Sequence, residues 1–366
     1  MRVALMSPYA LSVYGGVQEQ TLSMSRVLEN RGHRVLVVAP DSKDGATYDT
    51  SAEIVRLGRR WSLTANGSRA PLTLSARASG RARDVIDAFR PDVVHLHEPL
   101  APLLGWSTVR AHRHPTVATF HRSGSGPALR YGAPILRRMA TEFDVAVSVS
   151  DAAGATARRA YGVASEVLFN GIETDRYVAS ARQRDGGVVL LYVGRLEPRK
   201  GVATLVAAVR RHNERGVAPW RVVIAGDGPA RGALEAMGEG DAAVGFIGRI
   251  DDQAKREWIR KVHALVAPST HGESFGLVLL EGMASETLVV ASDITGYREA
   301  AGGHATLFRP GDAASLESAI EEALRTESAS AVAAARQYAE RWSMNALVEA
   351  YEERYARAVE RFRVTR

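Results

Sequence analysis

The stretch VVLLYVGRLEPRKG, residues 188–201, decides the fold. Its first six residues are apolar and rich in valine, which predicts a buried strand. The next eight include two glycines and three basic residues, and an amphipathic helical pattern follows from Val202 to Glu214. A buried strand, a glycine-containing turn and a helix make the first half of a βαβ unit.

The same alternation extends on both sides of this stretch and predicts two parallel sheets, each with its own helices. In the first half a helix is expected over Val17–Arg31, and strands are expected at Val3–Met6, Arg34–Ala39, Val93–Leu96, Thr116–Phe120 and Val145–Val149. In the second half strands are expected at Val188–Val193, Arg221–Ala225, Val244–Ile247, Ala264–Ala267 and Leu288–Ala291.

These patterns predict two doubly wound α/β domains, formed by residues 1–169 and 170–343, that face a cleft at the carboxyl ends of their strands. From Ala313 onward the sequence is helical nearly to Arg363. We expect the last helix, about residues 344–366, to cross back to the first domain.

Composition excludes several classes of protein. The 366 residues are 46% hydrophobic and 24% charged, which excludes a disordered chain, and the absence of cysteine excludes disulfides, thiolate metal sites and cysteine nucleophiles. The sequence contains no run of 18 apolar residues, so no membrane-spanning helix is predicted. The N-terminal apolar run is too short for an export signal. A cytoplasmic location is therefore expected.

The net charge of +6 is concentrated between Arg56 and Arg90, where eight arginines face two aspartates. Five apolar residues of this stretch fall on one helical face: Leu74, Ala78, Val85, Ile86 and Phe89. Two interpretations remain open: an ordinary helix packed on the sheet, or a surface that rests on anionic lipid. The second assigns membrane contact to Arg77 and Arg81 on the helix, and to Arg59, Arg60 and Trp61 in a preceding loop. Nucleic-acid binding is disfavoured because Trp61 and Phe89 are the only aromatic residues among these arginines.

Two motifs suit phosphate groups. Gly15-Gly16-Val17-Gln18 leaves bare amides at a helix N-terminus, although a tight turn would also need the two glycines. The pair is not a G-x-G-x-x-G motif, and the expected second strand ends at Ala39-Pro40 without an acidic residue, so a nicotinamide cofactor is disfavoured. Arg195 and Lys200 flank the turn of the opening stretch, where they suit a diphosphate, or else form a solvated charged loop.

Two glutamates with seven residues between them, Glu273 and Glu281, lie around a predicted helix start near Phe275. Carboxylates accept paired hydroxyl hydrogen bonds, so one can bind a sugar ring and the other a ribose. The amides of Phe275 and Gly276 can meet a phosphate. The alternative is a capping acid and a surface acid.

His121 ends an inner strand, where its side chain is expected at the ligand edge of the sheet. His95, His97 and Glu98 end the neighbouring strand. A metal trio there is disfavoured because no set of acidic residues completes it.

Together with GDGP (residues 226–229), these motifs resemble the retaining glycosyltransferases of family GT4, which have the two-Rossmann GT-B fold. The resemblance runs from Arg2 to about Tyr355. SPYALSVYGGVQ (7–18), HLHEP (95–99), VATFH (117–121), SVSDAA (148–153) and GRIDDQAK (248–255) are further similar to the actinobacterial phosphatidyl-myo-inositol mannosyltransferases.

The resemblance implies roles for individual residues. Glu273 would bind the donor sugar and Glu281 the ribose, while Gly16, Arg195 and Lys200 would hold the diphosphate. Asp252 and Lys255 match positions near the base, and His121 matches a histidine beside the reaction centre. Tyr9 and Gln18 match acceptor-side positions. The donor-binding set is Gly16, Arg195, Lys200, Asp252, Lys255, Glu273, Ser274, Phe275, Gly276, Leu277 and Glu281.

The resemblance also implies an activity: metal-independent transfer of mannose from GDP-mannose to a lipid acceptor such as phosphatidylinositol, with retention and without a cofactor. The enzyme would act as a peripheral protein on the inner face of the plasma membrane. Two alternatives stay open, namely transfer from a UDP-sugar to another acceptor and a nucleotide-sugar epimerase or hydrolase on the same scaffold.

Overall fold

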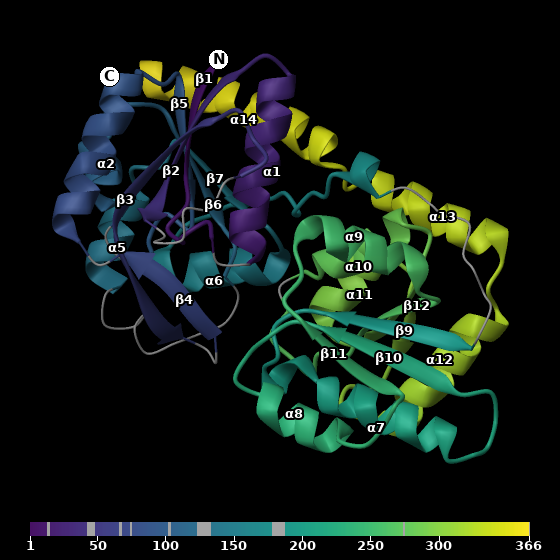
Figure 1. Cartoon of the computed structure of the whole chain (residues 1–366). Coiled ribbons are helices and arrows are strands. Elements are labelled where there is room, and N and C mark those ends of the chain that lie inside the picture. The colour runs from purple at the N-terminus through teal and green to yellow at the C-terminus, as the bar shows by residue number, and fades with distance from the viewer. Residues whose placement is uncertain are drawn as a thin grey trace. The chain divides into compact units, whose positions relative to one another are not determined.

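The computed structural model describes residues 1–12, 15–41, 48–65, 68–73, 75–101, 104–122, 133–177, 187–273 and 275–365. At residues 41, 59–65, 68–73 and 133–135 it describes the backbone and not the side chains. The chain folds into two compact units: Met1–Gly171 with Met344–Arg366, and Ile172–Ser343 (Figure 1).

Unit 1 is built on an eight-stranded sheet of order β4-β3-β2-β1-β5-β6-β7-β8, parallel except for the β3/β4 pair. Its strands are β1 (Arg2–Met6), β2 (Arg34–Asp41), β3 (Glu53–Ala65), β4 (Ser68–Thr73), β5 (Val93–His97), β6 (Thr116–Phe120), β7 (Val145–Ser148) and β8 (Glu166–Val167). Its helices are α1 (Gly16–Asn30), α2 (Ala76–Phe89), α3 (Trp106–Ala111), α5 (Ala133–Ala140), α6 (Asp151–Tyr161) and α14 (Met344–Val364).

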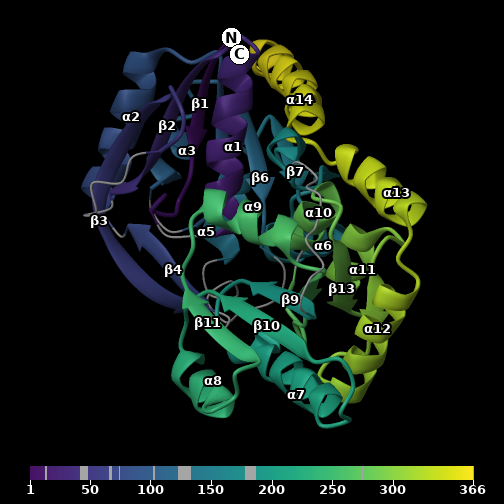
Figure 2. The same ribbon diagram turned by 45° about the vertical axis from the view of Figure 1, so that its right-hand side comes forward.

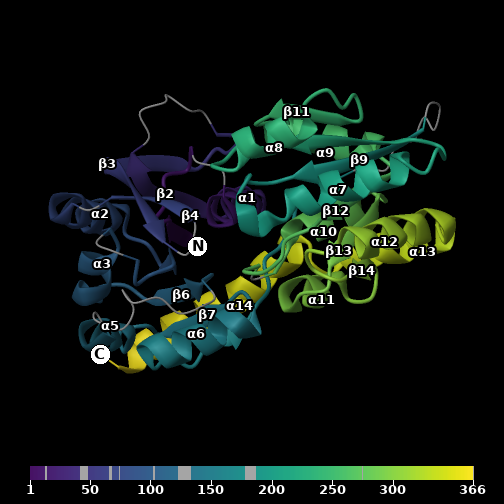
Figure 3. The same cartoon turned by 90° about the horizontal axis from the view of Figure 1, so that it is seen from below.

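Both faces of this sheet are covered, which explains why its inner strands β5 and β6 are buried at every position. Alternate residues such as Val3 and Leu5 pack beneath α1 and α14, whereas Ala4 and Met6 pack on the opposite face. That opposite face carries α2, α3, α5 and α6; the first three follow one another along one edge of Figure 3.

Unit 2 has a six-stranded parallel sheet of order β11-β10-β9-β12-β13-β14. Its strands are β9 (Val188–Val193), β10 (Trp220–Ala225), β11 (Val244–Gly248), β12 (Ala264–Ala267), β13 (Leu288–Ser292) and β14 (Thr306–Phe308). Its helices are η1 (Thr174–Arg176), η2 (Pro198–Lys200), α7 (Val202–Asn213), α8 (Arg231–Gly238), α9 (Asp252–Lys261), α10 (Leu277–Ala284), α11 (Thr295–Ala301), α12 (Ala313–Arg325) and α13 (Ala329–Glu340). The prediction of two Rossmann-like α/β domains is confirmed.

Local sequence explains where many helices begin. Short polar side chains accept a hydrogen bond from the amide three residues later, which satisfies one of the free N–H groups of the first turn. The residues that do so are Ser75, Ser150, Asp251, Asp312 and Ser328.

The expectation for Arg59, Arg60 and Trp61 was wrong, because these residues lie in strand β3 and not in a loop. β3 pairs in parallel with β2 and then in antiparallel with β4, so that Arg60 lies opposite Thr73. The sequence carried a signal for this hairpin: between the strands it reads Asn66-Gly67, a pair favoured in two-residue turns. The side chains of these three residues lie outside the described part, as does Leu74.

The last helix, α14, packs beside α1 within unit 1 (Figure 2). Its residue Glu352 bonds to Arg31 Nη2 at 2.6 Å and to His33 Nε2 at 2.7 Å. These hydrogen bonds, that of Arg31 above all, lower the pKa of Glu352 to about 2 from the ordinary 4.5.

We predict that Glu352→Gln destabilises unit 1 at neutral pH and that this effect disappears in acid. The folded-state pKa lies below the unfolded value, so the stabilisation is complete above pH 4.5 and is lost as the pH falls toward 2. Thermal unfolding of both proteins across this range measures the difference. Glu360→Gln, an exposed change on the same helix, is the control. A stability difference between the two proteins that stays constant with pH would show that the protonation of Glu352 is not linked to folding.

Candidate functional site

In each unit, some of the sequence-predicted residues lie at the point where the strand order reverses. In unit 1 the reversal lies between the paired strands β1 and β5, and in unit 2 it lies between β9 and β12. The loops after two such strands diverge to opposite sides of the sheet, which leaves a crevice at their carboxyl ends where ligands bind. Tyr9 and Glu98 follow β1 and β5, and Lys200 and Glu273 follow β9 and β12.

Glu273 is the centre of the polar group in unit 2. Its Oε1 atom lies 2.7 Å from Lys200 Nζ and 2.9 Å from Arg199 Nη1, and it accepts the hydroxyl of Ser269 at 3.1 Å. Ser269 in turn lies 2.9 Å from the hydroxyl of Tyr297. Burial would raise the pKa of Glu273, but Lys200 and Arg199 outweigh it and hold the pKa below its usual range. The side chain is therefore a carboxylate, a pure acceptor, at neutral pH.

A second carboxylate holds the two arginines of the same loop. Glu197 is buried, and its two oxygens lie 3.0 Å from Arg195 Nη2 and 3.0 Å from Arg199 Nε. The loop thus carries three cations against the carboxylates of Glu197 and Glu273. The surplus positive charge suits an anion such as a diphosphate.

Two glycines let the backbones of this site approach closely. A Cβ on Gly201, whose φ is +67°, would lie 1.9 Å from the carbonyl oxygen of Pro268. A Cβ on Gly296 would lie 2.4 Å from the carbonyl oxygen of Glu273. Only glycine fits at these positions, and they set the distance between the Lys200 turn and the Glu273 loop.

Glu281 lies in a buried ion pair. Its Oε1 atom is 2.8 Å from Lys255 Nζ, with both side chains at most 3% exposed, and Lys255 also lies 3.3 Å from Asp252. The predicted pair of glutamates therefore occupies two environments: Glu273 at the loop, and Glu281 inside α10. Glu281 is the fifth residue of α10, about one turn into the helix, because α10 begins at Leu277 and not at Phe275.

The predicted donor-binding residues between Glu273 and Glu281 differ in how deeply they are buried. Phe275 is buried and its ring packs edge-on against Trp342 at 5.4 Å, so its side chain is structural. Gly276 has a φ of +120° immediately before α10, and Leu277 opens that helix half-buried. Ser274 lies outside the described residues.

In unit 1, Glu98 organises the strand ends. It is buried, it adopts a φ of +45° that is rare for residues other than glycine, and it accepts the backbone amides of His121 and Arg122. Burial, and to a smaller extent the charge of Glu98, raises the pKa of the half-buried Tyr9. Glu98 thus bonds to the backbone of His121 and lies near enough to Tyr9 for its charge to act on the Tyr9 hydroxyl. Burial lowers the pKa of His121, so this histidine is neutral at physiological pH.

The glycine pair stands at the start of α1. Gly16 is exposed with nothing within 4 Å of an added Cβ, and no described side chain caps this helix. Gln18 is buried and its amide donates to the carbonyl of Ala10 at 3.5 Å. Gly16 thus presents open backbone, whereas Gln18 also supports the preceding loop.

The apolar face of α2 is buried against the sheet through Ala78, Ala82, Ile86 and Phe89. That face is the ordinary packing of a surface helix, and it leaves Arg77 and Arg81 exposed on the outside. Any contact of α2 with lipid therefore rests on charge alone. None of the helices in the described part of the chain combines the length and apolar character that crossing a bilayer requires.

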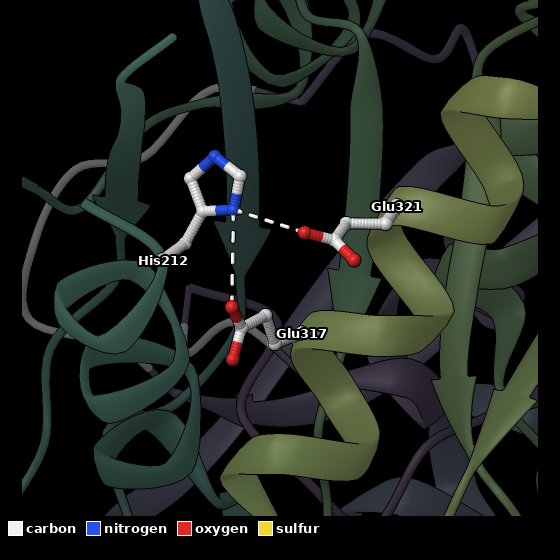
Figure 4. A group of neighbouring side chains, drawn as sticks. All are labelled: His212, Glu317 and Glu321. Atoms are coloured by element: carbon white, nitrogen blue, oxygen red, sulfur yellow. Dashed lines mark ion pairs between the residues drawn. The ribbon is translucent and has the colours of Figure 1, made fainter. Parts of the chain in front are cut away.

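One group of side chains in the described ranges has metal-ligand composition: His212, Glu317 and Glu321 (Figure 4). His212 Nδ1 lies 3.4 Å from Glu321 and 4.0 Å from Glu317. Arg215 Nη1 lies 2.7 Å from both carboxylates, and Arg211 Nε lies 2.7 Å from Glu317. Because two arginines already neutralise the two carboxylates, we interpret the group as an ion-pair cluster that joins α7 to α12.

Several residues of the site were missed at the level of sequence. Arg199 and Glu197 lie inside the quoted stretch 188–201, but spacing alone does not show which charge of a loop turns inward. Glu98 was considered only as a metal ligand. Ser269 and Tyr297 carried no signal, because a serine and a tyrosine in apolar surroundings are common in any core.

The comparisons cover both units. A model described as "Glycosyltransferase Family 4" matches residues 14–176, and one described as "Glycosyl transferases group 1" matches residues 187–326. The chain is 36% identical over 304 residues to a phosphatidyl-myo-inositol mannosyltransferase of Mycobacterium tuberculosis, which covers 81% of this chain and 79% of the relative. It is 35% identical over 341 residues to the protein of that name from Propionibacterium freudenreichii, covering 88% and 86%.

Among solved structures, a sucrose-phosphate synthase from Thermosynechococcus elongatus has a TM-score of 0.75 at 20% identity, covering 97% of this chain and 98% of that one. At this identity the likeness supports the GT-B fold alone. The family rests on the matched models and the two relatives: the chain belongs to the GT4 glycosyltransferases.

Proposed function

We propose that this glycosyltransferase moves mannose from GDP-mannose to a phosphatidylinositol-type lipid, with retention of configuration. The observation that carries the proposal is the group of Glu273, Lys200 and Arg199 at the carboxyl ends of β9 and β12. An ionised acceptor beside a surplus of cations suits sugar hydroxyls next to a diphosphate. Mannose and the lipid are supported by the names of the relatives.

The transfer needs charge stabilisation at the leaving group. As the bond between the anomeric carbon and the diphosphate oxygen breaks, negative charge grows on the diphosphate and positive charge on the sugar ring. Arg195, Arg199 and Lys200 are fixed donors for the first, and the Glu273 carboxylate holds the sugar hydroxyls. The acceptor hydroxyl gives its proton to the departing phosphate as the new bond forms. We propose that no metal ion or cofactor takes part.

We propose further roles for residues of unit 2 and, separately, for residues of unit 1. Glu281 would hold the ribose hydroxyls, with Lys255 fixing its carboxylate and Asp252 nearer the base. The amides of Phe275 and Gly276 would approach a phosphate, and Ser274 and Leu277 remain in the proposed donor-binding set. In unit 1 the open amide of Gly16 suits a phosphate, His121 suits the sugar, and Tyr9 and Gln18 suit the acceptor.

The direct test supplies the protein with labelled GDP-mannose and vesicles that contain phosphatidylinositol. Mannosylated lipid in the organic phase is the expected product. A thermal-shift series with GDP-, UDP- and ADP-sugars identifies the base independently. Label released only as free sugar would instead indicate a hydrolase, and interconversion of the donor sugar would indicate an epimerase. If labelled lipid formed only from a UDP-sugar, the proposed donor would be that UDP-sugar and not GDP-mannose.

A lipid acceptor requires the enzyme to reach a membrane surface, and we propose that the exposed arginines of α2 contribute, placing it as a peripheral protein on the inner face of the plasma membrane. Arg77→Ser with Arg81→Ser should weaken binding to anionic vesicles about tenfold or more, since each basic residue near such a surface contributes ~1 kcal/mol. Sedimentation with vesicles at low and high salt measures this.

The matched control is Arg158→Ser with Arg159→Ser, two exposed arginines of α6 on the same face of unit 1. Equal loss in both double variants would show that only net charge matters. Unchanged binding in the Arg77/Arg81 variant would exclude this surface of α2.

A further inference from the structure

A buried histidine pair joins the ends of strands β5 and β6. His97 is 2% exposed, and its Nδ1 atom lies 2.9 Å from Nε2 of His121. The two rings are 5.1 Å apart at an angle of 42°. The other ring nitrogen of His97, Nε2, is also buried and has no hydrogen-bond partner among the described residues.

Both histidines are neutral in the folded protein. Burial lowers the pKa of His97 to about 3. Burial, and to a smaller extent the neighbouring His97, lowers the pKa of His121. Each ring therefore carries one proton on one of its two nitrogens. A hydrogen bond between His97 Nδ1 and His121 Nε2 needs a proton on one of these two atoms and a lone pair on the other.

The surroundings of His97 decide which atom has the proton. If His121 Nε2 carried it, His97 would have to carry its own proton on Nε2, and a buried N–H group would be left without an acceptor. Orphaned buried N–H groups are rare, because a buried donor without an acceptor has lost its hydrogen bonds to water and gained none in return. If His97 Nδ1 carries the proton, it donates to His121 Nε2 and leaves only an unused lone pair. His121 must then hold its proton on Nδ1.

We propose that His97 is a positioning residue that holds His121 in the tautomer protonated at Nδ1, so that His121 presents an N–H donor to a hydroxyl oxygen of the transferred sugar. The sugar contact rests on the proposed function, whereas the tautomer does not. A donor fixed in place before the substrate arrives needs no rearrangement during the reaction.

The surrounding side chains hold His97 itself in place. Its ring stacks on that of His95 at 4.4 Å and 29°. Both nitrogens of His95 are engaged, Nδ1 with the Tyr355 hydroxyl at 2.8 Å and Nε2 with the Thr119 hydroxyl at 2.7 Å. Because Tyr355 belongs to α14, the C-terminal helix supports this stack from the face of the sheet that α14 covers. Glu98 fixes the backbone of His121 by accepting its amide N–H.

The first experiment reads the tautomers directly. The full chain is labelled with ¹⁵N-histidine, and long-range ¹H–¹⁵N correlations show which ring nitrogen of His97 and His121 carries the proton. Single variants assign the signals. We expect protonation at Nδ1 in both residues, and in His97→Phe we expect His121 to gain the form protonated at Nε2. Protonation of His121 at Nε2 in the unchanged protein would overturn the proposal whether or not mannose is the sugar.

The second experiment separates positioning from packing. His97→Phe keeps a flat ring in the stack without a donor, whereas His97→Asn is smaller but places an amide N–H near the former Nδ1. We expect His97→Phe to lower kcat for sugar transfer about tenfold or more, on the scale of other supporting hydrogen bonds, with KM for the donor little changed. His97→Asn should keep more of kcat despite its poorer packing. The reverse order would show that His97 acts through packing, and if no transfer is found with any donor, the tautomer measurement alone decides.

Discussion

Replacing Glu273 by glutamine is expected to lower kcat for sugar transfer by about 100-fold or more, the scale of losing one preorganised electrostatic contact in an active site. The change keeps the shape of the side chain but removes the charge that lies 2.7 Å from Lys200 and 2.9 Å from Arg199. An amide also offers one acceptor oxygen in place of two, so it cannot bind paired sugar hydroxyls as a carboxylate does. Initial rates with labelled donor, at saturation and below it, measure the loss in kcat and in kcat/KM.

The control for this variant is Glu239→Gln, an exposed glutamate of the same unit after α8. Glu239→Gln should transfer sugar at the rate of the unchanged protein. GDP binding by calorimetry shows whether the Glu273 variant still forms the nucleotide site. Turnover near normal in Glu273→Gln would remove this residue from the sugar site.

Replacing Lys255 by methionine is expected to destabilise unit 2 by about 3–5 kcal/mol, because it leaves Glu281 as a buried charge without its partner. Lys255 and Glu281 are 2% and 3% exposed, so water cannot replace the lost contact at 2.8 Å. Amide hydrogen exchange in α10 and β12 reports the loss where it occurs. Urea unfolding gives its size.

The matched control removes both charges. Lys255→Met with Glu281→Leu should be more stable than Lys255→Met alone, because replacing a buried pair by apolar residues is often nearly neutral. The double variant should still fail to bind the nucleotide if Glu281 holds the ribose. Equal destabilisation in the single and the double variant would show that packing around Lys255, and not the uncompensated carboxylate, is responsible.

The sequence predicted the sheets of both units because most of their inner strands are largely buried on both faces. A strand such as Val188–Val193 then reads as a continuous apolar run, and the helices show the 3.6-residue period. The β3/β4 hairpin was missed for the opposite reason. Its arginines and polar residues resemble a charged loop, and only the pairing of β3 with β2 and β4 makes it a strand.

The candidate site was likewise predictable from the sequence only in part. The residue types were visible along the chain: a glycine pair before a helix, cations after a strand, two glutamates around a helix start. The sequence by itself determined these positions because strand ends of a doubly wound sheet share one edge. It could not show that Lys200 and Arg199 converge on Glu273, that Glu281 pairs with Lys255, or that His97 contacts His121. Those pairs are separated by 24 to 74 residues, and only tertiary packing decided them, because contacts at such separations depend on how strands are ordered in the sheet and on which side chains are buried.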